Sequence, residues 1–209
     1  MVPIPLLYKK HHLDKDHTSI GLFRALNQHF EIKKVFYPGS HVHISPSFIF
    51  PEVVYADSFR NTYRFFDDPQ TIEFIRKNKE YTEEPLIRFY QQDYKKPFQD
   101  LANEYDLLIS QYAGFVGQAV KPYLKTGGLL VCNNSHGDAS MASIDPDYEL
   151  CAVYKRIGDQ KFTITTRGLD EYLIPKNGIQ PTKSQLLKSQ RGIAYVKSPS
   201  GYIFRKLNS

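Results

Sequence analysis

The fold is decided by two stretches in the middle of the chain, Glu104–Ser110 (EYDLLIS) and Tyr123–Val131 (YLKTGGLLV). Each contains an apolar run without alternating polar residues, which is typical of a strand that is buried on both faces. The segment 115–124 between them reads as a helix, although Pro122 restricts its length or bends it. A strand, a helix and a second strand in this order predict two parallel strands of one sheet.

Three further apolar runs precede these two strands, and each ends at a turn or near an acidic residue. They are residues 35–37 before Pro38-Gly39-Ser40, residues 53–56 before Asp57, and residues 86–90, which end near Asp93. A helix is predicted to begin near Asp16 or Thr18, either of which could cap it. Another is predicted to begin at Asp68-Pro69, where the carboxylate caps the helix and proline occupies the first turn.

Alternation of short apolar strands with helices predicts an α/β protein of the three-layer, Rossmann-like kind, with a mostly parallel sheet and helices on both faces. The pattern changes after Ala139. An antiparallel pair is predicted for residues 148–155 and 161–166, then a helix over 182–190 and a final hairpin of 193–196 with 202–204. We therefore expect residues 1–145 to form the parallel core and residues 146–209 an antiparallel, β-rich completion of the same domain.

The composition fits a folded protein of ordinary kind, with 209 residues, 41% hydrophobic and 23% charged. The two cysteines are too few for a disulfide framework or a cysteine-rich metal site. The apolar segment 1–7 is short and has no basic residues ahead of it, so it does not resemble a signal peptide. With no apolar run of the ~20 residues that a membrane span needs, a cytoplasmic protein without a membrane partner is expected.

The charge balance is basic, with 27 Lys and Arg against 22 Asp and Glu. Because this excess is spread along the chain, ordinary solvated surface is favoured over a nucleic-acid face, and no motif indicates nucleic acid. A small-molecule partner is the expectation, a nucleic-acid partner stays open as an alternative, and the oligomeric state is not predicted.

In order and spacing, the five strands resemble the core of the class I S-adenosylmethionine-dependent methyltransferases over about residues 30–135. In that family the turn after the first strand is rich in glycine and approaches the methionine part of the cofactor. An acidic residue after the second strand binds the ribose, and a polar residue after the third contacts the adenine. The resemblance implies these cofactor positions here: Gly39 and Ser40 at the turn, Asp57 at the ribose, Asp93 beside the adenine, Ser110, Gln111 and Tyr112 on the floor, and Tyr37 and Tyr112 as aromatic faces for the cationic sulfonium.

The first turn departs from the family pattern, because Tyr37–His41 (YPGSH) holds one glycine where the family has two or three. With a single glycine, the turn leaves less room for a ligand against its backbone, which favours either a shifted cofactor pose or an inactive site. A dinucleotide dehydrogenase is disfavoured because Gly-x-Gly-x-x-Gly is missing. Adenine N6-methylation is disfavoured because residues 110–113 (SQYA) lack the Asn/Asp-Pro-Pro-Tyr/Phe motif of those enzymes.

His136, which follows the fifth strand, is the candidate catalytic base, with Asp138 as the group that orients it and Asn133 or Ser135 available to hold substrate. The alternative for His136 is a loop histidine with a local turn hydrogen bond. Asp57 could instead cap the following turn, and Asp93 could lie in an ordinary loop. His41 and His43 lack a third ligand nearby, so no metal site is expected. The charged segment with His11, His12 and His17 is expected to be solvated surface, and Asp106 to be structural.

Two functions of different classes remain open. The first is an S-adenosylmethionine-dependent methyltransferase with an unidentified acceptor. The second is a catalytically silent Rossmann-like domain that binds a nucleotide-like ligand or a protein partner. An enzyme that modifies RNA or DNA through the basic surface is a third hypothesis.

Overall fold

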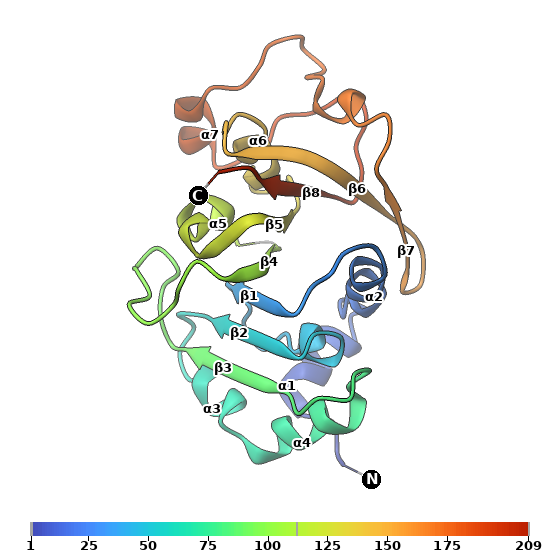
Figure 1. Cartoon of the computed structure of the whole chain (residues 1–209), viewed down its shortest axis with the longest axis vertical. Helices are drawn as coiled ribbons and strands as arrows, with labels where there is room; N and C mark the ends of the chain where they lie inside the picture. The colour runs from blue at the N-terminus through green and yellow to red at the C-terminus, as the bar shows by residue number, and fades with distance from the viewer. Residues whose placement is uncertain (1, 112, 209) are drawn as a thin grey trace.

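The computed structural model describes residues 2–111 and 113–208, and in this part of the chain one eight-stranded sheet runs through the molecule (Figure 1). Its strand order is β3-β2-β1-β4-β5-β8-β6-β7. The strands are β1 Lys34–Pro38, β2 Glu52–Ala56, β3 Leu86–Tyr90, β4 Tyr105–Ser110, β5 Leu124–Cys132, β6 Tyr148–Gly158, β7 Lys161–Thr165 and β8 Gly201–Lys206. The first five are parallel, and β8, β6 and β7 continue the sheet through antiparallel pairs. The prediction of a mostly parallel sheet with an antiparallel C-terminal part is confirmed.

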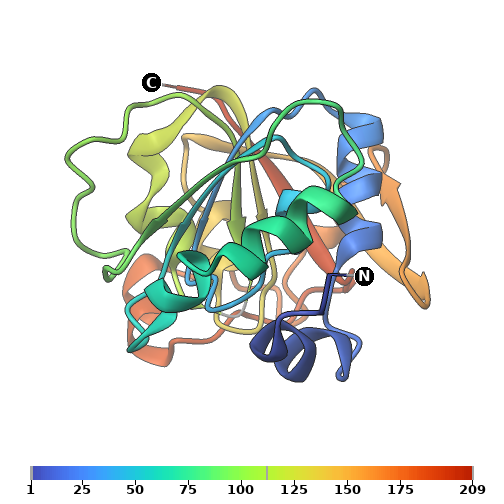
Figure 2. The same cartoon turned by 90° about the horizontal axis from the view of Figure 1, so that it is seen from below.

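Helices cover both faces of the sheet, as Figure 2 shows with α2 on one side and α5 on the other. One core cluster joins the sheet to the N-terminal helices and to those between β1 and β3; the other joins it to the helices that follow β4. On the first face lie α1 Leu6–Tyr8, the π-helical turn η1 Lys9–Leu13, α2 Ile20–His29, the 3-10 turn η2 Ser45–Phe48, α3 Thr62–Phe66 and α4 Pro69–Asn78. On the second lie α5 Val116–Ala119, η3 Lys121–Tyr123, α6 Asp138–Ser143 and η4 Asp170–Leu173, with α7 Lys183–Ser189 against α6.

Two-sided burial explains why the central strands are apolar throughout. In β1, Val35 and Tyr37 belong to one core cluster and Phe36 to the other, because successive side chains of a strand point to opposite faces. The edge strand β3, which contains Arg88, is the exception: its Leu86 is 62% exposed.

Local signals placed several helix ends correctly. The Asp68 side chain accepts a hydrogen bond from the Gln70 backbone N–H at 2.9 Å and caps α4, as predicted. Thr182 caps α7 in a reciprocal capping box with Gln185. The prediction for the first helix was wrong in detail, because α2 is preceded by Ser19 with φ 52° and no side-chain cap rather than by Asp16 or Thr18. Asp106 is structural as expected, since its carboxylate accepts from the backbone N–H groups of Lys33 and Lys34.

Two elements differ from the sequence prediction. The helix expected over 115–124 is divided into α5 and η3, with Pro122 inside the second turn. The hairpin of 193–196 with 202–204 does not form, because β8 pairs with β5 and β6 while Tyr195 makes an isolated bridge to Pro175. Both faces of β8 are buried, which an internal place in the sheet achieves and a terminal hairpin does not.

No helix in the described part of the chain combines the length and the apolar character that crossing a bilayer requires.

Substitution of Gly21 tests the contact between α2 and the β6–β7 turn. A Cβ atom at Gly21 would lie 1.7 Å from the Gln160 carbonyl oxygen. Gly21→Ala should therefore lower the free energy of unfolding by about 1–3 kcal/mol, although helix propensity alone favours alanine by about 1 kcal/mol. Urea denaturation measures the change. Asn27→Ala, on the exposed side of the same helix, is the control and should change stability by less than about 0.5 kcal/mol; an unchanged or stabilised Gly21→Ala variant would contradict the contact.

Candidate functional site

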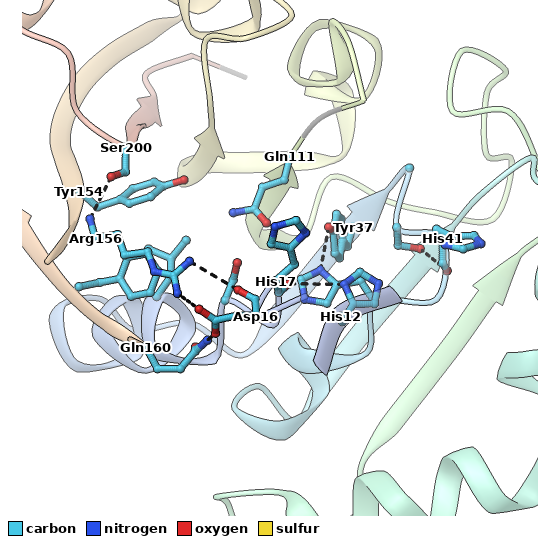
Figure 3. A pocket seen from close by; sticks show the side chains of 16 residues that line it. His12, Asp16, His17, Tyr37, His41, Gln111, Tyr154, Arg156, Gln160 and Ser200 are labelled. Carbon is cyan, nitrogen blue, oxygen red and sulfur yellow. Dashed lines mark hydrogen bonds and ion pairs between the residues drawn. The ribbon is translucent and has the colours of Figure 1, made fainter. Parts of the chain in front are cut away.

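A cavity of about 530 Å³ opens at the carboxyl ends of β1 and β4 (Figure 3). Because β1 is followed in the sheet by β2 on one side and β4 on the other, this is the point at which the strand order reverses, where open α/β sheets bind ligands. Its walls come from the β1 turn, the end of β4, the N-terminal segment and the β6–β7 hairpin. They include Tyr37, Gly39, Ser40, His41, His43, Gln111, His12, Asp16, His17, Tyr154, Arg156, Gln160 and Ser200.

The turn after β1 is bonded to the end of β2. Gly39 has φ +70°, a conformation that glycine adopts without strain, and its N–H donates to the Ala56 carbonyl at 2.7 Å. A Cβ atom on Gly39 would lie 2.6 Å from the Cβ of Ala113. The space beside Gly39 that a side chain would fill is therefore occupied by Ala113 of the loop after β4, and it is not open to a ligand in the cavity.

The Asp57 carboxylate holds two backbone segments together. Oδ2 accepts a hydrogen bond from the His41 N–H and Oδ1 accepts one from the Phe59 N–H, both at 2.7 Å. Gln91 braces the same loop by donating from Nε2 to the carbonyls of Asp57 and Phe59 at 3.0 and 2.9 Å. Asp57 does not line the main cavity. Its contacts fix the shape of the loops after β1 and β2.

A second cavity of about 410 Å³ lies beside these loops and shares His41 with the first. Its walls are mainly apolar and aromatic. The His41 ring packs edge-to-face on Phe59, with centroids 5.1 Å apart, and on His11, with centroids 4.9 Å apart. Phe59 remains 63% exposed, which for a phenyl ring at a cavity is typical of a binding surface.

Two of the cavity histidines are neutral. His43 is buried, donates from Nε2 to the Thr18 carbonyl at 2.8 Å, and accepts at Nδ1 from the Tyr37 hydroxyl at 3.1 Å. The His12 ring stacks on it at 4.3 Å. Burial lowers the pKa of His43 to about 3 and that of His12 to about 4, so neither ring carries charge at neutral pH. The expectation that the His11–His17 segment is solvated surface is therefore wrong for His12.

Asp138 and Ser110 come together, but in the core and away from the cavity. The Ser110 hydroxyl and the Gly117 N–H both donate to Oδ2 of Asp138, the second at 3.0 Å. The other carboxylate oxygen is buried and has no hydrogen-bond partner among the described residues. Burial raises the pKa of Asp138 to about 6.

The expected pairing of Asp138 with His136 is not made, because Asp138 begins α6 with its side chain directed at α5. His136 is exposed, and its Nδ1 lies 3.1 Å from the Ser135 hydroxyl. Ser135 in turn donates to Asn133 Oδ1 at 2.7 Å. His136 does not line the main cavity.

Asp93 lies three residues beyond β3, in the loop that leads to β4. Its Oδ1 accepts from the Lys95 N–H at 2.9 Å, which closes a local turn. It lines neither of the two cavities at the ends of β1 and β2. Tyr112 lies outside the described residues.

Of the residues singled out from the sequence, Tyr37, Gly39, Ser40 and Gln111 meet in the wall of the main cavity. Asp57 lies behind this wall, and Asp93, Ser110, His136 and Asp138 lie elsewhere. The residues that sequence reasoning missed are His12, Asp16 and His17 from the N-terminal segment and Arg156 and Gln160 from the hairpin. Among the described residues, no group of three or more His, Cys, Asp or Glu side chains could hold a metal ion.

The ionisation of Asp138 predicts a specific dependence of stability on pH. Its pKa in the folded protein, about 6, lies above that of the unfolded chain, so the native state binds the extra proton and loses stability as pH rises from about 4 to 6. Relative to Asp138→Asn, the wild-type protein should lose roughly 3 kcal/mol over this range. Urea denaturation at a series of pH values measures the difference. Parallel pH profiles of the two proteins would show that folding leaves the pKa of Asp138 unchanged.

Comparison with known proteins bears on the fold. No protein-family model matches the sequence, and no curated protein sequence matches it either. Among solved structures, a candidate O-methyltransferase from Klebsiella pneumoniae superposes with a TM-score of 0.51 at 10% identity, over 99% of this chain and 91% of that one. A candidate S-adenosyl-L-methionine-dependent methyltransferase from Methanococcus maripaludis gives 0.49 at 14% identity, over 97% and 90%. The chain therefore shares the Rossmann-like α/β fold of the candidate O-methyltransferase.

Proposed function

We propose that this protein is an S-adenosylmethionine-dependent methyltransferase whose cofactor site is the main cavity at the carboxyl ends of β1 and β4. The observation that carries the proposal is the position of this cavity at the reversal of strand order. Four residues that the family resemblance assigns to the cofactor line it: Tyr37, Gly39, Ser40 and Gln111.

The residues present suit an adenosyl group in a shifted pose. Both Asp57 oxygens, which the family resemblance assigns to the ribose, already accept backbone hydrogen bonds. The side of Gly39 that a ligand would approach in the family faces Ala113. The second cavity offers instead an aromatic wall formed by the packed rings of His41 and Phe59, and His41 also lines the main cavity. We infer that the adenine would lie against this pair of rings, and that Tyr37, Ser40 and Gln111 would hold the methionine part.

The electrostatics of the wall favour a cationic sulfonium. The cofactor, when bound, supplies an electrophilic methyl group on positively charged sulfur. Because burial lowers the pKa values of His12, His41 and His43, these imidazoles place no positive charge beside it at neutral pH. The buried Tyr37 ring adds an aromatic face of the kind that attracts cations.

The size of the main cavity, about 530 Å³, favours a small-molecule acceptor. Asp16 of the N-terminal segment forms an ion pair with Arg156 and accepts a hydrogen bond from Gln160 Nε2 at 2.9 Å, so the segment and the β6–β7 hairpin meet at the cavity wall. A small hydroxyl- or amine-bearing acceptor fits such a site.

A second candidate is a catalytically silent domain that binds a nucleotide-like ligand or a protein partner. The observations that favour it are the close approach of Ala113 to Gly39 and the backbone hydrogen bond that each Asp57 carboxylate oxygen already accepts. Both features leave less of the backbone and fewer polar atoms available to an adenosyl group than the family pattern implies.

Calorimetric titration with S-adenosylmethionine and S-adenosylhomocysteine tests the proposal. Micromolar binding of both is expected. Phe59→Ala should weaken it about tenfold or more, because a ring stacked on a base contributes on the order of 1 kcal/mol beyond the buried area. Tyr63→Ala, an aromatic substitution on the following helix outside both cavities, is the matched control and should leave affinity unchanged. If neither compound gave a heat of binding, the result would favour the catalytically silent domain.

A further inference from the structure

Four histidines line the main cavity, and three of them are held by contacts to protein groups. Both ring nitrogens of His43 are hydrogen-bonded. His12 stacks on His43, and its Nδ1 donates to the His17 carbonyl at 3.4 Å. His41 packs edge-to-face between two other rings. His12 Nε2 is buried and has no hydrogen-bond partner among the described residues, but burial lowers the pKa of all three rings, so each is a weaker base than an ordinary imidazole.

His17 differs from the other three. Its backbone is fixed, because the His17 N–H donates to the His12 carbonyl at 2.9 Å and the His17 carbonyl accepts from the His12 ring. The side chain is exposed, and none of the hydrogen bonds among the described residues involves its ring. In Figure 3 the His17 ring points toward Gln111 at the end of β4.

Among the four histidines of the cavity wall, His17 is the one whose side chain is exposed. Asp16 is paired with Arg156 and with Gln160 of the hairpin. His12 and His43 are neutral, and the Tyr37 hydroxyl is bonded to His43. The remaining titratable groups of the cavity wall are His41 and Tyr154, and the fully exposed Asp159 lies outside the wall beside Arg156.

The backbone around His17 is held in an unfavourable conformation. Asp16 and Ser19 both have φ 52°, in the left-handed region that residues with a Cβ atom rarely adopt. Such conformations persist where surrounding contacts impose them, and they gather at functional sites. Here the contacts of Asp16 with the hairpin and of Thr18 with His43 impose the position of His17.

We propose that His17 is the catalytic base of this site and takes the proton of a hydroxyl or amine acceptor. The inference rests on the proposed function. As the acceptor O–H or N–H bond breaks, its proton goes to a ring nitrogen of His17. The acceptor electron pair forms the bond to the methyl carbon, and the electron pair of the broken carbon–sulfur bond stays on sulfur. The imidazolium then returns its proton to water.

Proton NMR titration of the histidine Hε1 signals tests this without an identified acceptor. S-Adenosylmethionine carries one positive charge more than S-adenosylhomocysteine, at the sulfur that bears the transferred methyl group. If His17 faces that group, the pH midpoint of its signal should be lower in the first complex than in the second by at least about 0.5 unit, since a charge within ~6 Å acts with this strength at a partly hydrated site. His17→Gln assigns the signal by its loss.

His136 serves as the internal control, because it is exposed, lies outside the cavity wall and should titrate identically in both complexes. His17→Gln should keep its affinity for S-adenosylhomocysteine within about twofold. Binding of both compounds with equal His17 midpoints would overturn the assignment of His17 and leave the proposed function intact. Binding of neither compound would overturn the proposed function, and this inference with it.

Discussion

The Asp57 carboxylate joins the ends of two neighbouring parallel strands, and the shape of the whole binding region depends on it. Its two hydrogen bonds, each from a backbone N–H to a charged acceptor, hold the loops that carry His41 and Phe59. Hydrogen bonds of this kind stabilise by about 1.5–3 kcal/mol each. His41 lines both cavities. By holding the His41 backbone, the Asp57 carboxylate fixes a wall that the two cavities share, although Asp57 itself does not line the main cavity.

The main cavity is completed by parts of the chain that lie far apart in sequence. Parallel strands bring the β1 turn and the end of β4 to one edge of the sheet, which is a property of the fold. The N-terminal segment and the β6–β7 hairpin, about 140 positions apart, then meet through Asp16 and Arg156. The buried His43 ring and the half-buried His12 ring stay neutral, so the wall combines aromatic surface with the exposed imidazole of His17.

The architecture was predictable because its signals are local. The apolar run of β4 and the Asp68-Pro69 start of α4 depend on residues that are adjacent in sequence. The place of β8 between β5 and β6 could not be predicted in this way, because long-range packing decides which strands pair. For the same reason His12 and His17 read as part of a charged, solvated segment, although contacts with His43 and with the hairpin put them in the cavity wall. Asp138 faces the core because α6 packs on Gly117 of α5, which spacing alone does not reveal.

A crystal structure of the protein with S-adenosylhomocysteine tests the central claim most directly. The account predicts ligand density in the main cavity, with the base against His41 and Phe59, and with the Asp57 oxygens still bonded to the backbone N–H groups of residues 41 and 59. A ribose diol bonded to the Asp57 carboxylate, or a ligand seated away from both cavities, would contradict it.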